Sequence, residues 1–231
     1  MPSAWLTDLA WAALAIAFAS SAVILMDLFG RGHRQPMRVM EWVWPITALY
    51  FGPVAVWAYW RFGRPLSHKW LAEHELDEPP DKPRWATTAV GVSHCGAGCT
   101  LGDIMAEFAI FALGVAIAGE TVYAEYVGDY ILAIALGLAF QYFAIAPMRG
   151  LSVRKGIIAA AKADILSLTA FEVGLFGWMA LQAFVFYPAA HHIHPDTPVY
   201  WMSMQAGMII GFLTAYPVNS WLIRRGIKEA M

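Results

Sequence analysis

The residues best suited to chemistry in this sequence lie close together near its middle. They combine one imidazole, two thiols and two carboxylates within fourteen positions: His94, Cys95, Cys99, Asp103 and Glu107. Two thiolates beside an imidazole are donors that soft or borderline ions such as Cu(I) and Zn(II) prefer. The pattern therefore predicts a transition-metal site, with copper favoured over zinc as the ion.

Two local geometries would bring these donors together. If a helix runs through the stretch, the cysteines and carboxylates recur every four residues and form one slanting stripe, because each step of four drifts about 40° around a helix. If Gly96 and Gly98 instead break the chain, the helix begins near Cys99, and its free N–H groups and dipole would stabilise that thiolate. Both geometries place sulfur, imidazole and carboxylate near one another.

The spacing of the two cysteines leaves other interpretations open. C-x3-C is not a zinc-finger spacing, and two ligands do not fill a tetrahedral shell. Cys95 and Cys99 could be small packing residues beside a close helix-contact face formed by Gly98, Gly102 and Ala106. They could also form a dithiol redox pair, provided that the neighbouring glycines let the chain bend.

A second group of candidate ligands follows later in the chain, in the sequence His191-His192-Ile193-His194. Three histidines within four residues can bind a divalent metal, although the prolines around them are equally typical of a solvated loop. A haem with histidine axial ligands is also compatible with the sequence, but the C-x-x-C-H motif for covalent attachment is missing.

Hydrophobic helices must position these residues. The chain of 231 residues is 59% hydrophobic and only 14% charged, which is too little charge to cover a soluble domain of this size. Apolar segments long enough to cross a hydrocarbon core of about 30 Å occur about six times. We predict an all-α, polytopic transmembrane bundle forming one domain over 1–231, with spans at about 4–29, 42–60, 98–118, 130–146, 165–187 and 200–223 and a polar cytoplasmic connection at 61–86.

The lysines and arginines predict how this bundle is oriented. With six spans, both termini lie on one side, and that side carries twelve of the fifteen basic residues. The positive-inside rule then places both termini in the cytoplasm. The first loop is an exception because it carries Arg31, Arg34 and Arg38, and this exception disappears if the first or second segment does not span. The lack of a signal peptide and of glycosylation sequons predicts a bacterial inner membrane.

Two motifs resemble a known family. They are Trp44-Pro45-Ile46-Thr47-Ala48-Leu49-Tyr50 followed by Gly52-Pro53, and His94-Cys95-x-x-Gly98-Cys99-x-Leu101-Gly102-Asp103. In combination they resemble a bacterial membrane protein family that is catalogued only as a domain of unknown function. The resemblance covers the second span to the end of the chain, roughly four-fifths of it. It implies one bacterial membrane domain and implies nothing about activity.

The function predicted from these residues is binding or movement of a transition-metal ion, and an enzymatic activity is less expected. His94, Cys95 and Cys99 would be the first ligands, while Asp103 and Glu107 would extend a polar path or carry a coupled proton. The alternatives are an accessory subunit of a larger membrane complex, without chemistry of its own, and a membrane thiol–disulfide protein. Besides the lipid bilayer, a homo-oligomer or a larger complex is the expected partner. The net charge of −2 argues against nucleic acid.

Overall fold

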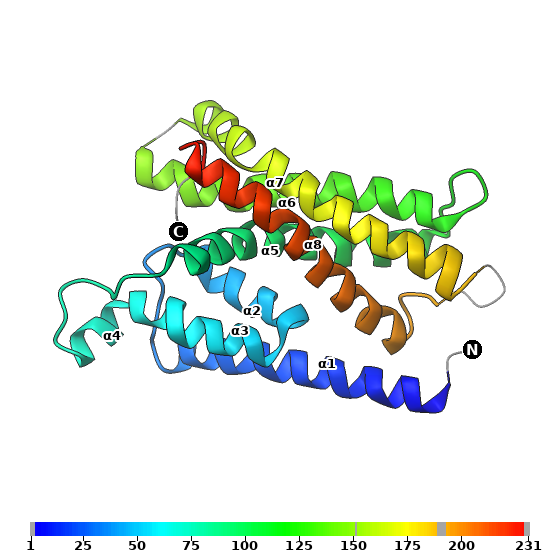
Figure 1. Cartoon of the computed structure of the whole chain (residues 1–231), viewed down its shortest axis with the longest axis horizontal. Coiled ribbons are helices and arrows are strands. Elements are labelled where there is room, and N and C mark those ends of the chain that lie inside the picture. The colour runs from blue at the N-terminus through cyan, green and yellow to red at the C-terminus, as the bar shows by residue number, and fades with distance from the viewer. Residues whose placement is uncertain (1–2, 151, 189–192, 229–231) are drawn as a thin grey trace.

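The chain folds into helices that run nearly the whole length of an elongated bundle (Figure 1). The computed structural model describes residues 3–150, 152–188 and 193–228, with the backbone alone for 145–149. The long helices are α1 (Ala4–Leu25), α5 (Arg84–Leu113), α6 (Thr121–Arg149), α7 (Val153–Leu181) and α8 (Pro198–Arg224). A π-helical turn lengthens α1 at Met26–Gly30 and α7 at Gln182–Phe186. The predicted all-α polytopic fold is confirmed.

Among the residues that the structure describes, five helices are long and apolar enough to cross a membrane, where the sequence predicted about six. Their spans are Ala4–Gly30, Arg84–Leu113, Thr121–Ala144, Val153–Phe186 and Pro198–Arg224. At 1.5 Å per residue even the shortest is about 36 Å long, which exceeds a hydrocarbon core of about 30 Å. Large apolar side chains such as Trp11, Phe18, Val173 and Leu213 remain exposed on them, as contact with lipid tails requires. The protein is therefore a multi-pass membrane protein.

The expected span at 42–60 is instead a helical hairpin. Its first arm is α2 (Met40–Phe51), and its second is α3 (Pro53–Ala58) continued by a π-helical turn at Tyr59–Gly63. Gly52 separates them with φ of 53°, a conformation that residues with a Cβ rarely adopt. Twelve residues of α2 reach only about 18 Å, so neither arm crosses the membrane alone.

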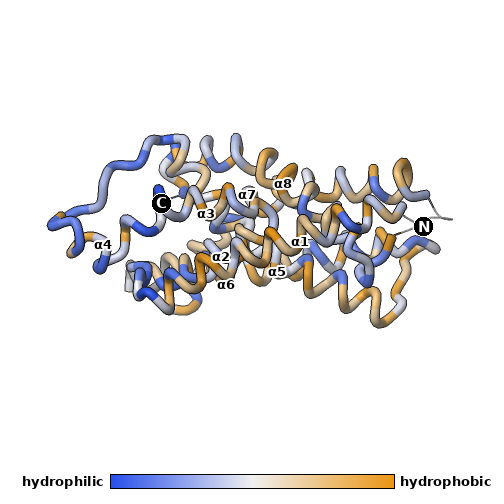
Figure 2. The backbone as a smooth tube through the Cα atoms, turned by 90° about the horizontal axis from the view of Figure 1, so that it is seen from below, coloured by the Kyte–Doolittle hydropathy of each residue, from blue (hydrophilic) through white to orange (hydrophobic). Residues whose placement is uncertain are grey.

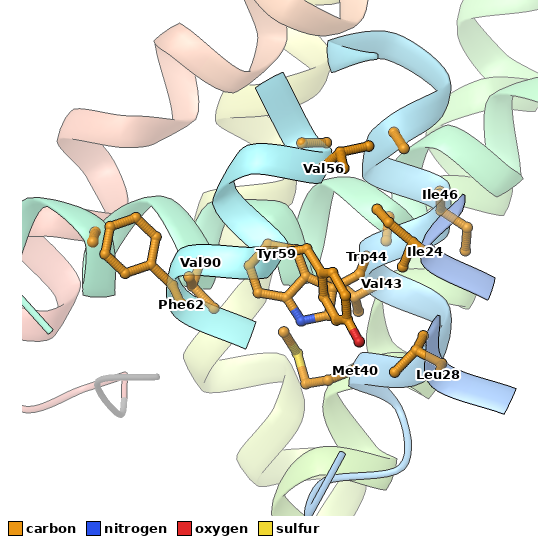
Figure 3. Close-up of a cluster of buried hydrophobic side chains, with 14 residues drawn as sticks. Ile24, Leu28, Met40, Val43, Trp44, Ile46, Val56, Tyr59, Phe62 and Val90 are labelled. Atoms are coloured by element: carbon orange, nitrogen blue, oxygen red, sulfur yellow. The ribbon is translucent and has the colours of Figure 1, made fainter. Parts of the chain in front are cut away.

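Contacts between the two arms show that the chain reverses direction at Gly52. The rings of Trp44 on the first arm and Tyr59 on the second lie edge to face, with centroids 5.8 Å apart. Both belong to a buried cluster that also contains Leu28, Met40 and Val90 (Figure 3). At the tip, Gly52 is buried beside Ile16 and Ser20 of α1, while Pro53 and Val54 remain exposed.

The hairpin changes the relation between the two ends of the chain. Because it enters and leaves at the same end of the bundle, α1 begins at one end and α8 finishes at the opposite one (Figure 1). This differs from the sequence prediction that both termini lie on one side. We call the end that holds α4 (His68–Glu73) the α4 end, and the other the far end. Figure 2 shows hydrophilic segments gathered at the α4 end.

Candidate functional site: a buried polar path

The helix α5 runs without a break through the predicted site, so Gly96 and Gly98 do not interrupt it. The first of the two expected geometries is therefore the observed one. Cys95, Cys99, Asp103 and Glu107 form a stripe along α5, and all four side chains are completely buried. The stripe faces the interior of the bundle formed by α6, α7 and α8.

The glycines of this stretch explain how closely α6 approaches. A Cβ on Gly98 would lie 2.5 Å from the Cα of Gly137, and one on Gly102 would lie 2.5 Å from the backbone nitrogen of Ala133. Only residues without a side chain allow the two backbones so near each other. The glycine face predicted as a helix contact is thus present, on the same helix as the polar stripe.

At the α4 end of the stripe, Cys95 lies within a small hydrogen-bonded group. Its Sγ is 3.0 Å from Oγ of Ser167 on α7, and Asn219 on α8 donates to the same Ser167 oxygen. Close by, the Lys228 ammonium donates to Oδ1 of Asp164 at 2.6 Å, and both side chains are fully buried. Three helices and the segment after α8 therefore meet at this point.

Further toward the far end, carboxyl groups from three helices come together. Cys99 lies beside Glu172 of α7, and Asp103 lies within electrostatic range of both Glu172 and Glu107. Asp129 of α6 interacts with the same three carboxyl groups. The sequence stripe on α5 is therefore one wall of a larger polar interior.

The path continues to a small cavity near the far end. Glu107 lies next to Tyr200 of α8, and Glu125 of α6 lies within range of both. Glu125, Tyr200 and His194 line a cavity of about 30 Å³, which is room for about one water molecule. Titratable groups thus follow one another from Glu125 to the Asp164–Lys228 pair, over most of the length of the bundle.

The charges of the central carboxyl groups are not balanced by protein groups. The eight carboxyl oxygens of Asp103, Glu107, Asp129 and Glu172 make no hydrogen bond of normal geometry to any residue the structure describes. Among the same residues, no lysine or arginine forms an ion pair with them. Four carboxylates cannot remain ionised together in so apolar a setting, so they must take up protons or other cations.

His94 does not join the cysteines. One residue along a helix turns by about 100°, and the His94 ring accordingly lies near Phe140 of α6, with ring centroids 6.3 Å apart. Neither ring nitrogen has a hydrogen-bond partner among the described residues. Among all the residues that the structure describes, no three histidine, cysteine, aspartate or glutamate side chains converge in a way that could hold a metal ion.

The second predicted group of ligands is only partly described. His191 and His192 lie outside the residues that the structure describes. His194 lies at the far end, where its ring is 6.0 Å from that of Phe111. His194 and Cys95 therefore lie toward opposite ends of the bundle, as the sequence predicted for the loop that holds His194.

Several residues of the path were missed in the sequence analysis. Glu125 and Asp129 are acidic residues at the start of an apolar run, a signal that was available. Asp164 precedes the predicted fifth span by one residue, and this position in the sequence predicts a surface residue. Lys228 carries no local signal at all, because only the tertiary fold brings it to Asp164.

Comparison with known protein families identifies a match over the second part of the chain. The model of a family described as "Domain of unknown function (DUF4396)" matches residues 84–228, which include α5 to α8 and every residue of the polar path. The match begins at Arg84, so it is shorter than the predicted resemblance and excludes the Trp44–Pro53 motif and the hairpin. No curated protein and no solved structure matches the chain.

Proposed function

This chain belongs to the DUF4396 family, and we propose that it moves a cation across the membrane along the path between α5, α6, α7 and α8. Four buried carboxyl groups without basic partners support this function: Asp103, Glu107, Asp129 and Glu172. Carboxyl groups inside a membrane are costly, and they typically mark ion pathways and proton relays. The proton is the cation that such a row of groups handles most directly.

The order of the groups supports a stepwise transfer. From the far end, a proton taken up by Glu125 passes to Glu107, whose neighbours are Tyr200 and Asp129. From there it reaches Asp103 and then Glu172. Each transfer moves a proton from one carboxyl oxygen to the next, directly or through a water molecule, and leaves the donor ready to accept another.

The α4 end provides the exit. Glu172 lies beside Cys99, and one turn further along α5 the Cys95 thiol contacts the Ser167 hydroxyl, which Asn219 holds in place. The Asp164–Lys228 pair follows. A buried ammonium repels a cation that arrives from the path, so the release step requires this pair to rearrange.

The distribution of basic residues supports an orientation. With five spans and a hairpin, all fifteen lysines and arginines belong to the half of the bundle at the α4 end. The positive-inside rule then places the α4 end in the cytoplasm and the start of α1 outside it. Six spans would place the basic residues of the first loop outside the cytoplasm, against the positive-inside rule. Five spans place them in the cytoplasm with the others. The multi-pass topology and this charge bias suit a bacterial inner membrane.

Proteoliposomes with an internal pH dye test the proposal. A potassium gradient with valinomycin would drive protons inward, and the native protein should accelerate acidification over protein-free vesicles. Glu172→Gln and Asp103→Asn should each slow the flux by about tenfold or more, because each removes a proton-accepting group. Asp8→Asn, at an exposed position outside the path, is the control. Flux equal to that of empty vesicles, with either protons or Na⁺ as the driven ion, would refute the proposal.

A transition-metal ion is the second candidate cargo, and one observation favours it. Met208 of α8 belongs to the same buried cluster as Cys95 and Cys99, and thiol and thioether sulfur are the donors that Cu(I) prefers. Competition against a chromogenic Cu(I) chelator should then reveal binding that is lost in a Cys95→Ser, Cys99→Ser variant. Unchanged binding by this variant would exclude the sulfur cluster as the site.

The remaining alternatives predict different observations. An accessory subunit should co-purify reproducibly with a partner in mild detergent and show no flux of its own. A thiol–disulfide protein should form a Cys95–Cys99 bond reversibly, but the two cysteines lie one turn apart on a regular helix. The Cα separation there is about 6 Å, near the upper end of the usual range for a disulfide.

A further inference from the structure

A large groove opens between the hairpin and α6 at the α4 end, away from the polar path. Its volume is about 920 Å³, which is in the upper range for small-molecule sites. Most of its lining is apolar and includes Met40 and Trp42 of α2 with Phe140 and Phe143 of α6. Trp42 and Phe143 are 56% and 63% exposed.

Two basic side chains also line this groove, Arg38 and Lys82. In the part of the chain that the structure describes, neither makes a hydrogen bond or an ion pair. The acid nearest to Arg38 along the chain, Glu41, is held by Arg34 through two hydrogen bonds of 2.7 Å. Asp81, which precedes Lys82, is exposed and forms no ion pair with it among the described residues. Burial lowers the pKa of Lys82 below its ordinary value. Among the described residues, neither basic side chain is therefore paired directly with a carboxylate, although Arg38 lies within electrostatic range of Glu41.

The charges and the apolar walls lie at different depths. Arg38 precedes the first turn of α2, and Lys82 precedes α5 by two residues, so both are at the polar end of the groove. Phe140 lies nine residues before the end of α6 at Arg149, about 14 Å deeper. This distance is about the thickness of one leaflet.

We propose that the groove binds an anionic phospholipid of the leaflet at the α4 end, with its phosphate at Arg38 and Lys82 and an acyl chain along Phe140 and Phe143. Basic pockets between membrane helices bind anionic headgroups in this way. The apolar walls favour a lipid over a soluble anion, because only a lipid fills both parts of the groove. This site is independent of the proposed cation path.

Native mass spectrometry of the purified protein tests the proposal, with phosphatidylglycerol and phosphatidylcholine of identical acyl chains as probes. The native protein should retain phosphatidylglycerol preferentially. An Arg38→Gln, Lys82→Gln variant should lose at least about tenfold in apparent affinity for it, since each basic residue adds an electrostatic contribution. Lys155→Gln is the matched control, because it removes an exposed charge at the same end but outside the groove.

Three results would overturn the lipid site. They are equal retention of the two lipids, unchanged phosphatidylglycerol binding in the double variant, and displacement of the lipid by millimolar inorganic phosphate, which would indicate a soluble-anion site. A second variant, Ala139→Trp, fills the groove without altering its charge. It should lower lipid binding as well, while retention times in size-exclusion chromatography confirm that each variant is folded.

Discussion

Lys228 is a buried lysine whose charge is compensated by the carboxylate of Asp164. A lysine that is taken out of water is strongly destabilising unless a carboxylate compensates it, and Asp164 does so at 2.6 Å. We predict that Lys228→Met or Asp164→Asn alone lowers the free energy of unfolding by about 3–5 kcal/mol, since each leaves an unpaired buried charge or acceptor. Unfolding in a detergent titration, followed by tryptophan fluorescence, measures the loss.

The double variant Lys228→Met, Asp164→Asn is the control for this pair. Because it removes both charges, it should recover most of the stability that either single substitution loses. If the losses of the two single variants simply add in the double variant, the ion pair is not what stabilises this end of the bundle.

Arg34 and Glu41 form an ion pair outside the five spans, in which Glu41 is buried and Arg34 is half exposed. The guanidinium of Arg34 holds the pKa of Glu41 below its ordinary value of 4.5. A carboxyl group whose pKa is lowered by folding stabilises the protein above its unfolded pKa, and the benefit is lost as the pH falls through the folded value. Glu41→Gln should therefore lower Tm at pH 7, and the difference from the native protein should shrink below pH about 4.5. A difference that stays constant down to pH 3 would show that charge is not its source.

Residue types and helical spacing were sufficient to predict part of the site. A regular helix places residues four apart on one stripe, so the alignment of the cysteines with Asp103 and Glu107 followed once α5 was continuous. The same geometry separates His94 from Cys95, and the prediction that they act together neglected this. Glu172 stands within an apolar run of the sequence, but its position beside Cys99 depends on how α7 packs against α5, which no local pattern encodes.

At the scale of elements, the contact between α5 and α6 depends on glycines. We predict that Gly98→Ala and Gly102→Ala each destabilise the protein by about 1–3 kcal/mol, because a Cβ would meet the backbone of α6 at 2.5 Å. Gly91→Ala is a matched control on the same helix, since its Cβ would meet nothing within 4 Å. Thermal unfolding in detergent measures all three variants. A loss in Gly91→Ala as large as in Gly102→Ala would attribute the effect to helix flexibility and not to close packing.

The hairpin is an apolar segment that the sequence wrongly predicts to cross the membrane. Residues 42–60 are long and apolar enough for a span, and membrane helices tolerate prolines such as those at 45 and 53. Pro45 does lie inside α2. The reversal arises at Gly52, whose positive φ lets Pro53 begin a new helix in another direction. Hydrophobicity sets which segments enter the membrane, but contacts such as Trp44 with Tyr59 decide whether they cross it.

For the whole molecule, the number of spans determines which loops share a side. Six spans place the segment around Arg31 and the segment around Glu78 on opposite sides of the membrane, whereas the hairpin places them together. The Lys69 ammonium of α4, in the same connection as Glu78, donates to the backbone oxygen of Arg31 at 2.6 Å, so this connection is in direct contact with the first loop. All basic residues then lie toward one side, and the charge bias and the fold agree.

Cysteine accessibility in intact cells distinguishes the two topologies. The native Cys95 and Cys99 are fully buried, so the unmodified protein provides the background for labelling. We predict that a membrane-impermeant maleimide labels Ser3→Cys in intact cells, and that Arg31→Cys and Glu78→Cys react only after permeabilisation, because both would face the cytoplasm. Labelling of Arg31→Cys but not Ser3→Cys in intact cells would instead restore six spans and both termini in the cytoplasm. The direction of the proposed path would stay the same, since Glu125 and Tyr200 lie toward the outer side in both topologies.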